Sequence, residues 1–170
     1  MDRYEKAIAD SQVGIDDAVV AAEVKKILEK VPENMTPEVW KTCLGAIDLT
    51  TLSTEDSEKS VAAFTKRVND FENDYPQYPH VASICVYSNF AEVVETNCDV
   101  EGVRTCVVAA GFPSSQTFSA VKVADVALAK EAGADEVDIV MNIGMFRDKN
   151  YEDLCDEIIE LKHVLKDRHL

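Results

Sequence analysis

The chain has 170 residues, of which 46% are hydrophobic and 29% are charged, a composition typical of one soluble globular domain. Its formal net charge of −15 argues against a nucleic-acid or anionic-membrane partner, because no cluster of Lys and Arg is available to neutralise phosphates. No apolar run approaches the roughly 20 residues that span a bilayer, and the N-terminus lacks the apolar core of a signal peptide, so we expect a cytoplasmic protein.

The first part of the chain is predicted to be helical. Residues 15–31 place Val19, Val24 and Ile27 on one face of a helix, with charged residues opposite. A second helix is expected to start at Pro37, with Thr36 as its N-cap. We therefore assign residues 1–45 to an N-terminal helical extension.

Four short, β-branched and mostly apolar segments follow, at residues 46–52, 81–88, 103–111 and 136–142. Such segments are typical of strands in a sheet that is covered on both sides. Between them lie helical patterns: a helix capped by Ser53 or Thr54, a short one within residues 89–97, and one that ends at Gly133. The last helix is expected to begin at Asn150 and to run to the end of the chain.

The alternation of strands and helices predicts a parallel sheet with right-handed crossovers. Two architectures fit, an open doubly wound sheet or part of a (β/α)8 barrel. A nucleotide-binding open sheet would carry a glycine-rich loop after its first strand, but "DLTTLSTED" contains no glycine. A complete barrel needs about 250 residues and eight strands, and only four strands are predicted.

Polar residues recur on one face of the predicted strands. Because side chains alternate along a strand, each strand has one apolar face and one mixed face. The mixed faces carry Asp48 and Thr50 on the first strand, Cys85 on the second and Asp138 on the fourth. These groups either line the lumen of a barrel at an active site or make structural hydrogen bonds at strand ends, and alternation alone leaves both interpretations open.

Four segments resemble deoxyribose-phosphate aldolase: "DLTTL", "ICVYSNF", "GFPSSQT" and above all "GADEVDIV", which occur in that family's order. The resemblance runs from about Ile47 to the C-terminus. It implies an α/β fold in which residues 46–170 form a parallel (β/α)4 half of a TIM (β/α)8 barrel. It also implies a class I aldolase, which cleaves 2-deoxyribose 5-phosphate reversibly to glyceraldehyde 3-phosphate and acetaldehyde through a lysine Schiff base.

The resemblance also implies roles for single residues. Asp138 matches the aspartate that transfers protons, and Asp48 matches the one that helps to hold the lysine network. Thr50 and Cys85 match positions that line the substrate pocket, although a cysteine such as Cys85 is more often a small core residue than a nucleophile. Lys122 is expected at the surface or in a salt bridge.

The lysines of the family are missing from this sequence. The family's Schiff-base lysine comes from a "KTSTG"-like segment on the sixth strand and a second lysine lies on the seventh, whereas none of the twelve lysines here falls inside a predicted strand. We therefore expect the N-terminal half of the enzyme, inactive alone. The alternative is a non-catalytic half-barrel that acts as an assembly or binding module.

The remaining expectations concern cofactors and partners. The five cysteines form no C-x-x-C pair and the three histidines are isolated, which predicts free thiols, no metal site and no cofactor. The substrate of the complete enzyme would be a small phosphorylated sugar. Because half a barrel leaves strand edges unpaired, we also expect a homo-oligomer.

Overall fold

The N-terminal part of the chain is helical. The computed structural model describes residues 2–11 and 14–170, and the chain divides after Thr42 into two units. The helices of this part are α1 (Arg3–Asp10), α2 (Asp17–Glu29), the 3-10 helix η1 (Val31–Asn34) and α3 (Pro37–Leu44). Thr36 caps α3 as predicted, because its Oγ1 accepts a hydrogen bond from the Val39 N–H at 3.3 Å. No described residue of α1, α2 or α3 is buried.

A four-stranded parallel sheet forms the centre of the second unit. Its strands β1 (Asp48–Thr50), β2 (Ser83–Tyr87), β3 (Arg104–Val108) and β4 (Glu136–Asp138) lie side by side in sequence order. A doubly wound sheet reverses its strand order at a switch point, whereas a barrel adds each strand beside the previous one. The sequential order therefore confirms the half-barrel architecture.

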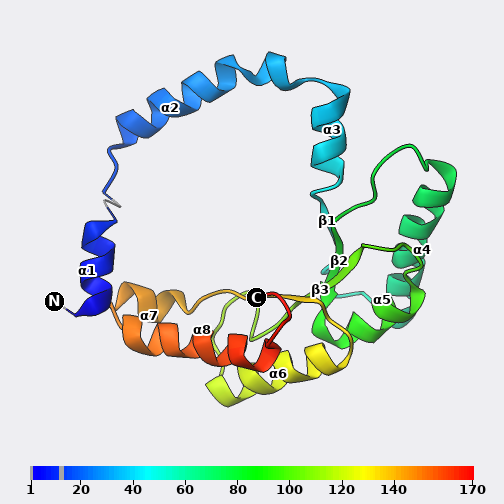
Figure 1. Cartoon of the computed structure of the whole chain (residues 1–170). Helices are drawn as coiled ribbons and strands as arrows, with labels where there is room; N and C mark the ends of the chain where they lie inside the picture. The colour runs from blue at the N-terminus through cyan, green and yellow to red at the C-terminus, as the bar shows by residue number, and fades with distance from the viewer. Residues whose placement is uncertain (1, 12–13) are drawn as a thin grey trace. The chain divides into compact units, whose positions relative to one another are not determined.

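Helices cover the apolar face of this sheet. The main ones are α4 (Glu58–Asp74), α5 (Ala91–Asn97), α6 (Ser119–Glu131) and α8 (Tyr151–Leu165), with α4 next to α5 and α6 next to α8 (Figure 1). The strands contribute Ile84, Val86, Val107 and Val137 to the core, and the helices contribute Val61, Val68, Val94, Val126, Leu161 and Leu165. Burial of each such side chain stabilises the fold by about 1.5–3 kcal/mol. The apolar face of every strand is therefore held against the helices, and the opposite face remains available for a functional site.

All four strands are shorter than predicted, and the fourth shows why. The fourth was expected over residues 136–142, but β4 ends at Asp138, whose carbonyl accepts the last ladder bond from the Ala109 N–H at 3.1 Å. Beyond Ala109 the chain turns through Ala110 and Gly111, both with positive φ, so no partner remains for residues after Asp138. They lead instead into an unpredicted helix, α7 (Ile143–Arg147), which Asn142 caps through Met145 N–H.

The predicted cap of α4 is wrong. The helix starts after Ser57, whose hydroxyl accepts from the Ser60 N–H at 3.2 Å, and not after Ser53 or Thr54. Residues 51–57 form a loop in which the Asp56 carboxylate accepts bonds from Thr51 Oγ1 and the Ser53 N–H, at 2.8 and 3.0 Å. This loop holds the carboxyl end of β1 in place before α4 begins.

The last residues of the chain return to the sheet. The His169 N–H donates to the Asp135 carbonyl and the Val137 N–H donates to the His169 carbonyl, both at 3.0 Å, which adds one parallel bridge beside β4. The edge of the fourth strand was expected to be unpaired, and at this point that expectation is wrong. The bridge continues the sequential order of a barrel.

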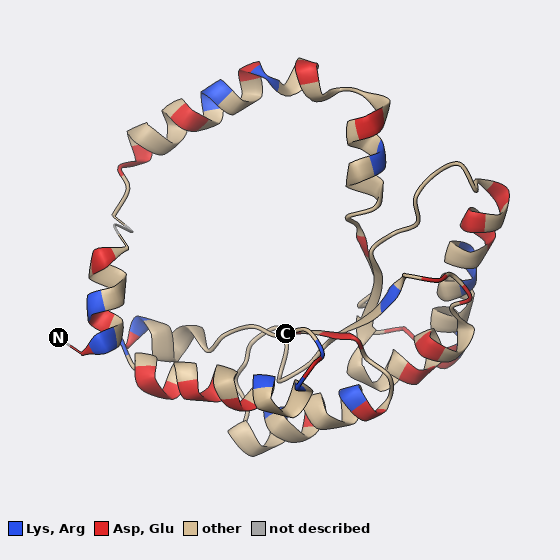
Figure 2. Cartoon of the chain, in the orientation of Figure 1, with Lys and Arg blue, Asp and Glu red and all other residues tan. Residues whose placement is uncertain are grey.

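Acidic residues are spread along the helices of the second unit (Figure 2). On α8 the acidic residues are Glu152, Asp153, Asp156, Glu157 and Glu160, and the one lysine of this helix is Lys162. Acidic residues therefore outnumber basic ones along this helix. Within the described residues, no helix combines the length and the apolarity that crossing a membrane requires.

Candidate functional site

The mixed faces of the strands meet on the side of the sheet that faces away from the core. Thr50 on β1 pairs with Cys85 on β2, which in turn pairs with Cys106 on β3. Two residues after Cys106, Val108 pairs with Asp138 on β4. Because residues two apart share a face, Asp48 and Thr50 lie on the same side as these residues. The structure therefore brings all four predicted site residues, Asp48, Thr50, Cys85 and Asp138, to one face.

Asp48 is fixed at the start of β1. Its Oδ1 accepts a hydrogen bond of 2.7 Å from Ser83 Oγ, which is fully buried on the neighbouring strand. The Thr50 hydroxyl donates to the Asp48 carbonyl at 3.0 Å. Both Asp48 and Thr50 are exposed to solvent, so they present polar groups at the surface of the sheet.

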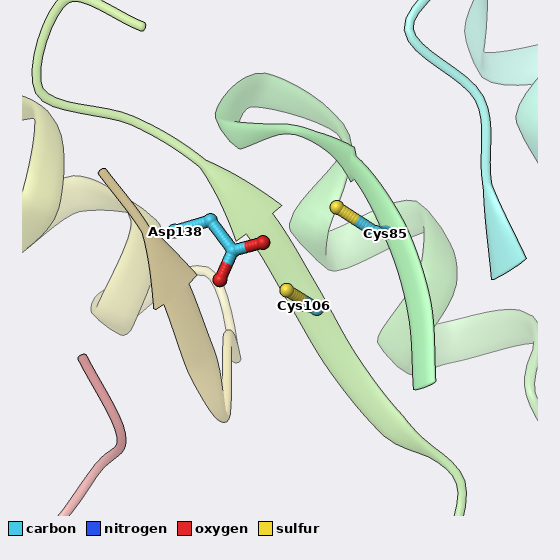
Figure 3. Close-up of side chains that lie close together, drawn as sticks. All are labelled: Cys85, Cys106 and Asp138. Atoms are coloured by element: carbon cyan, nitrogen blue, oxygen red, sulfur yellow. The ribbon is translucent and has the colours of Figure 1, made fainter. Parts of the chain in front are cut away.

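Cys85, Cys106 and Asp138 form a cluster on three adjacent strands. Their ligand atoms, the two Sγ atoms and a carboxylate oxygen, all lie within 4.8 Å of one another. Asp138 extends from β4 across β3 toward Cys106, and Cys85 projects from β2 beside it (Figure 3). The two cysteines are 3% and 1% exposed, whereas Asp138 is exposed, so the carboxylate forms the open side of the cluster.

A small apolar group surrounds the two thiols. It contains Cys85, Cys106 and Val108, with Leu52, Tyr87 and Phe112 packed against them. The Tyr87 hydroxyl donates to the Leu52 carbonyl at 2.9 Å, which joins the end of β2 to the loop after β1. Cys85 is thus the small, buried residue that its type predicts.

The environment changes the ionisation of the cluster. Although Asp138 is exposed as a whole residue, partial burial of its carboxyl raises the pKa of this group. The negative charge of Asp48 raises this pKa further, while a hydrogen bond with Cys106 acts in the opposite direction. The hydrogen bond with Cys85, together with burial, raises the pKa of the Cys106 thiol, and the same bond lowers the pKa of Cys85. Asp138 therefore takes up a proton more readily than an ordinary aspartate.

The two acids next to Asp138 have structural partners. Asp135 forms an ion pair with Arg168 and accepts a hydrogen bond from the Thr105 N–H at 3.1 Å. Glu136 forms an ion pair with Arg104 on β3. These contacts hold the start of β4 in the sheet and leave Asp138 as the acid of this segment that joins the cysteine cluster.

Lys122 lies elsewhere, in the interior between helices. Its Nζ donates to Glu157 Oε1 and to Ser115 Oγ, each at 2.7 Å, and the side chain is 1% exposed. The predicted salt bridge is confirmed and the predicted surface position is wrong, because α8 packs on α6 and encloses this position. None of the four described strands contains a lysine.

Sequence patterns did not identify Cys106 or Ser83 as parts of this site. Both occupy positions whose alternation places them on the mixed face, at the third position of β3 and the first of β2. Alternation was the signal that could have found them. Their partners, Cys85 and Asp48, follow only from the register between strands.

Comparison with known proteins finds relatives named deoxyribose-phosphate aldolase. No family model matches the chain. The deoxyribose-phosphate aldolase of Clostridium tetani is 33% identical over 124 residues, which cover 73% of this chain and 53% of that protein. The deoxyribose-phosphate aldolase of Mycoplasma mobile is 34% identical over 108 residues, or 64% of this chain and 49% of that protein. A relative from Caenorhabditis elegans aligns at 29% identity with 99% of this chain and 56% of its own length.

Solved structures agree on the fold. The structure titled "QR15, an Aldolase" matches with a TM-score of 0.64 at 24% identity, covering 74% of this chain and 52% of that one. The tetrameric deoxyribose-phosphate aldolase of Aeropyrum pernix matches with a TM-score of 0.58 at 20% identity, covering 83% and 56%. The chain spans about half the length of the relatives it matches, in sequence and in structure.

Proposed function

Because this chain is a partial homologue of the deoxyribose-phosphate aldolases, we propose that it carries the aspartate-bearing part of an aldolase active site. The complete site would cleave 2-deoxyribose 5-phosphate reversibly to glyceraldehyde 3-phosphate and acetaldehyde. The observation that carries this proposal is the convergence of Asp48, Thr50, Cys85 and Asp138 on one face of the half-barrel. In barrel enzymes of this fold, catalytic residues come from the ends of several different strands.

Asp138 is the proposed proton-transfer group. It ends β4, it is exposed, and its raised pKa brings its ionisation nearer to the pH at which an acid–base catalyst works best. In the proposed reaction a lysine iminium accepts the electrons as the carbon–carbon bond breaks. Asp138 would then move the proton to or from the reacting carbon by way of water.

Asp48 and its neighbours would shape the rest of the pocket. Ser83 fixes one oxygen of Asp48, which leaves the other carboxylate oxygen to orient a cationic lysine. Thr50 presents a hydroxyl at the exposed end of β1, and Cys85 supplies a small side chain below it. None of the roles proposed for these residues requires a cofactor.

The Schiff-base lysine would come from outside these four strands. A nucleophilic lysine must lose its proton, which requires desolvation or a nearby cation. Lys122 is buried, but its Nζ is occupied by hydrogen bonds to Glu157 and Ser115 and lies between helices, away from the polar face of the strands. We therefore infer that the chain alone does not form the iminium.

The second candidate function is a half-barrel that assembles without catalysis. The absence of lysine from the described strands favours it. A homo-oligomer is proposed in either case. The deoxyribose-phosphate aldolase of Aeropyrum pernix, whose fold is similar, is described as tetrameric. A cytoplasmic location belongs to the proposal as well, because all five cysteines are free thiols.

The test is a fusion of this chain to the part of the Clostridium tetani relative that it does not match. We expect the folded fusion to cleave 2-deoxyribose 5-phosphate, and acetaldehyde with borohydride to label one lysine, in the Clostridium part. Asp138→Asn should lower the turnover by about 10²–10⁴-fold, whereas Asp148→Asn, an exposed acid on α7's C-terminal side, should leave it unchanged.

Three results would count against the proposal. A folded fusion without turnover would favour the assembly module. A stoichiometric lysine adduct on the isolated 170-residue chain would contradict the inference about the lysine. A loss of only a few-fold in Asp138→Asn would return this residue to a structural role.

A further inference from the structure

The cluster of Cys85, Cys106 and Asp138 has the composition of a metal site. It brings two sulfur ligands and one oxygen ligand together from three adjacent strands, within 4.8 Å of one another. In a tetrahedral site with Zn–S bonds of about 2.3 Å, two sulfur ligands lie about 3.8 Å apart. The upper limit of 4.8 Å exceeds this separation by about 1 Å.

We propose that Cys85, Cys106 and Asp138 bind one thiophilic divalent cation, of which Zn²⁺ and Cd²⁺ are the representatives. Thiolates select soft or borderline metals over Mg²⁺ and Ca²⁺, which prefer oxygen ligands. Three protein ligands leave one coordination position for water or a small molecule, as in open zinc sites.

The surroundings of the cluster suit a cation. Asp48 adds a further carboxylate on the same face of the sheet, two residues before Thr50, which pairs with Cys85. Arg104, two residues before Cys106 on β3, is paired with Glu136. A bound cation would neutralise these charges and displace the thiol protons.

The geometry also defines how the cation would enter. Leu52, Tyr87 and Phe112 pack against the two thiols, so a cation has no open path to them from this apolar side. Asp138 extends toward Cys106 (Figure 3), and it is the exposed member of the cluster. The cation would therefore arrive through the carboxylate, and the fourth coordination position would point to solvent.

This inference does not depend on the proposed aldolase activity, because all three ligands belong to this chain. The test uses the reduced full-length chain with Cys43, Cys98 and Cys155 replaced by serine, which removes the other three thiols. Titration with Co²⁺ should give one equivalent of bound metal with a sulfur-to-cobalt charge-transfer band. Zn²⁺ should displace the Co²⁺ and abolish the band.

Single variants assign the ligands. Cys85→Ala and Cys106→Ala, checked for folding by circular dichroism, should each weaken binding by at least about 10–100-fold and reduce the charge-transfer intensity. Asp138→Asn should weaken binding but keep the sulfur band, and Asp148→Asn should bind as the parent does. Retention of full affinity in either folded cysteine variant would overturn the assignment.

X-ray absorption of the zinc-loaded parent chain supplies a measurement that needs no variant at the site. We expect two sulfur ligands per zinc, with oxygen completing the coordination shell. A shell of oxygen or nitrogen alone, or no binding at one equivalent by the folded reduced chain, would contradict the proposal.

Discussion

Lys122 on α6 and Glu157 on α8 form an ion pair in the interior of the second unit, with Nζ 2.7 Å from Oε1 and side chains that are 1% and 8% exposed. Ser115 and Ser119 complete the network, since Lys122 donates to Ser115 Oγ at 2.7 Å and Ser119 donates to Glu157 Oε2 at 3.3 Å. The network thus joins the loop after β3 to both helices. A buried pair of this kind stabilises the fold only while both partners are present.

Lys122→Met should destabilise the chain by about 3–5 kcal/mol, because it leaves the Glu157 carboxylate buried without its partner. The double variant Lys122→Met/Glu157→Met should recover much of that loss, since it removes both charges. Urea denaturation measures both effects. Lys66→Met, which breaks the exposed pair with Asp70, is the matched control and should change stability by less than about 1 kcal/mol. An equally small effect of Lys122→Met would contradict the role of the buried pair.

Ser57→Ala tests where α4 begins. The Ser57 hydroxyl accepts from the Ser60 N–H, and the Ser60 hydroxyl accepts from the Ser57 N–H, so two end groups of the helix depend on this pair. Loss of such a cap costs about 1 kcal/mol. Ser53→Ala, at the position that the sequence pattern suggested, should cost less than about 0.5 kcal/mol. Thermal unfolding of both variants compares the two positions, and a larger loss in Ser53→Ala would place the cap there instead.

The raised pKa of Asp138 predicts a dependence of stability on pH. The folded chain binds the Asp138 proton more tightly than the unfolded chain, so ionisation of this group disfavours the folded state above its raised pKa, and protonation relieves the effect as the pH falls through that pKa. Asp138→Asn should therefore have a higher Tm than the parent at neutral pH, and the difference should shrink toward acid pH. Both chains are measured with EDTA present to exclude metal ions.

Asp148→Asn is the control for that experiment, because it removes one negative charge from an exposed position. It should not reproduce the pH-dependent difference in Tm. An Asp138→Asn variant that is less stable than the parent at neutral pH would show that the ionised carboxylate is favourably held in the fold.

Self-association is expected from the edge of the sheet. Within the described sheet β1 pairs with β2 alone, so its other edge presents backbone N–H and C=O groups to a partner. Light scattering coupled to gel filtration at micromolar concentration should report a dimer or a larger closed assembly. A monomer whose mass does not change with concentration would mean that the edge is covered in another way.

The sequence alone determined features that depend on neighbouring residues. The alternation of strands and helices, the Thr36 cap and the glycine that ends α6 (Gly133, φ +100°) follow from local periodicity and backbone preference. The same period of two placed Asp48, Thr50, Cys85 and Asp138 on the polar faces of their strands. Since a barrel directs one face of every strand away from the helices, these four residues of the candidate site could be predicted before its geometry.

Only the tertiary structure decided which of these groups touch. Cys106 became part of the cluster because the register of β2 and β3 sets it opposite Cys85, and register depends on hydrogen bonds between segments that are distant in sequence. Lys122 is buried because α8 packs over α6, a contact that the helical pattern around Lys122 does not encode. Ser57 was one of several serines and threonines able to cap α4, and the Asp56 hydrogen bonds to the loop selected it. In each case several local arrangements have similar free energies, and long-range packing and pairing choose among them.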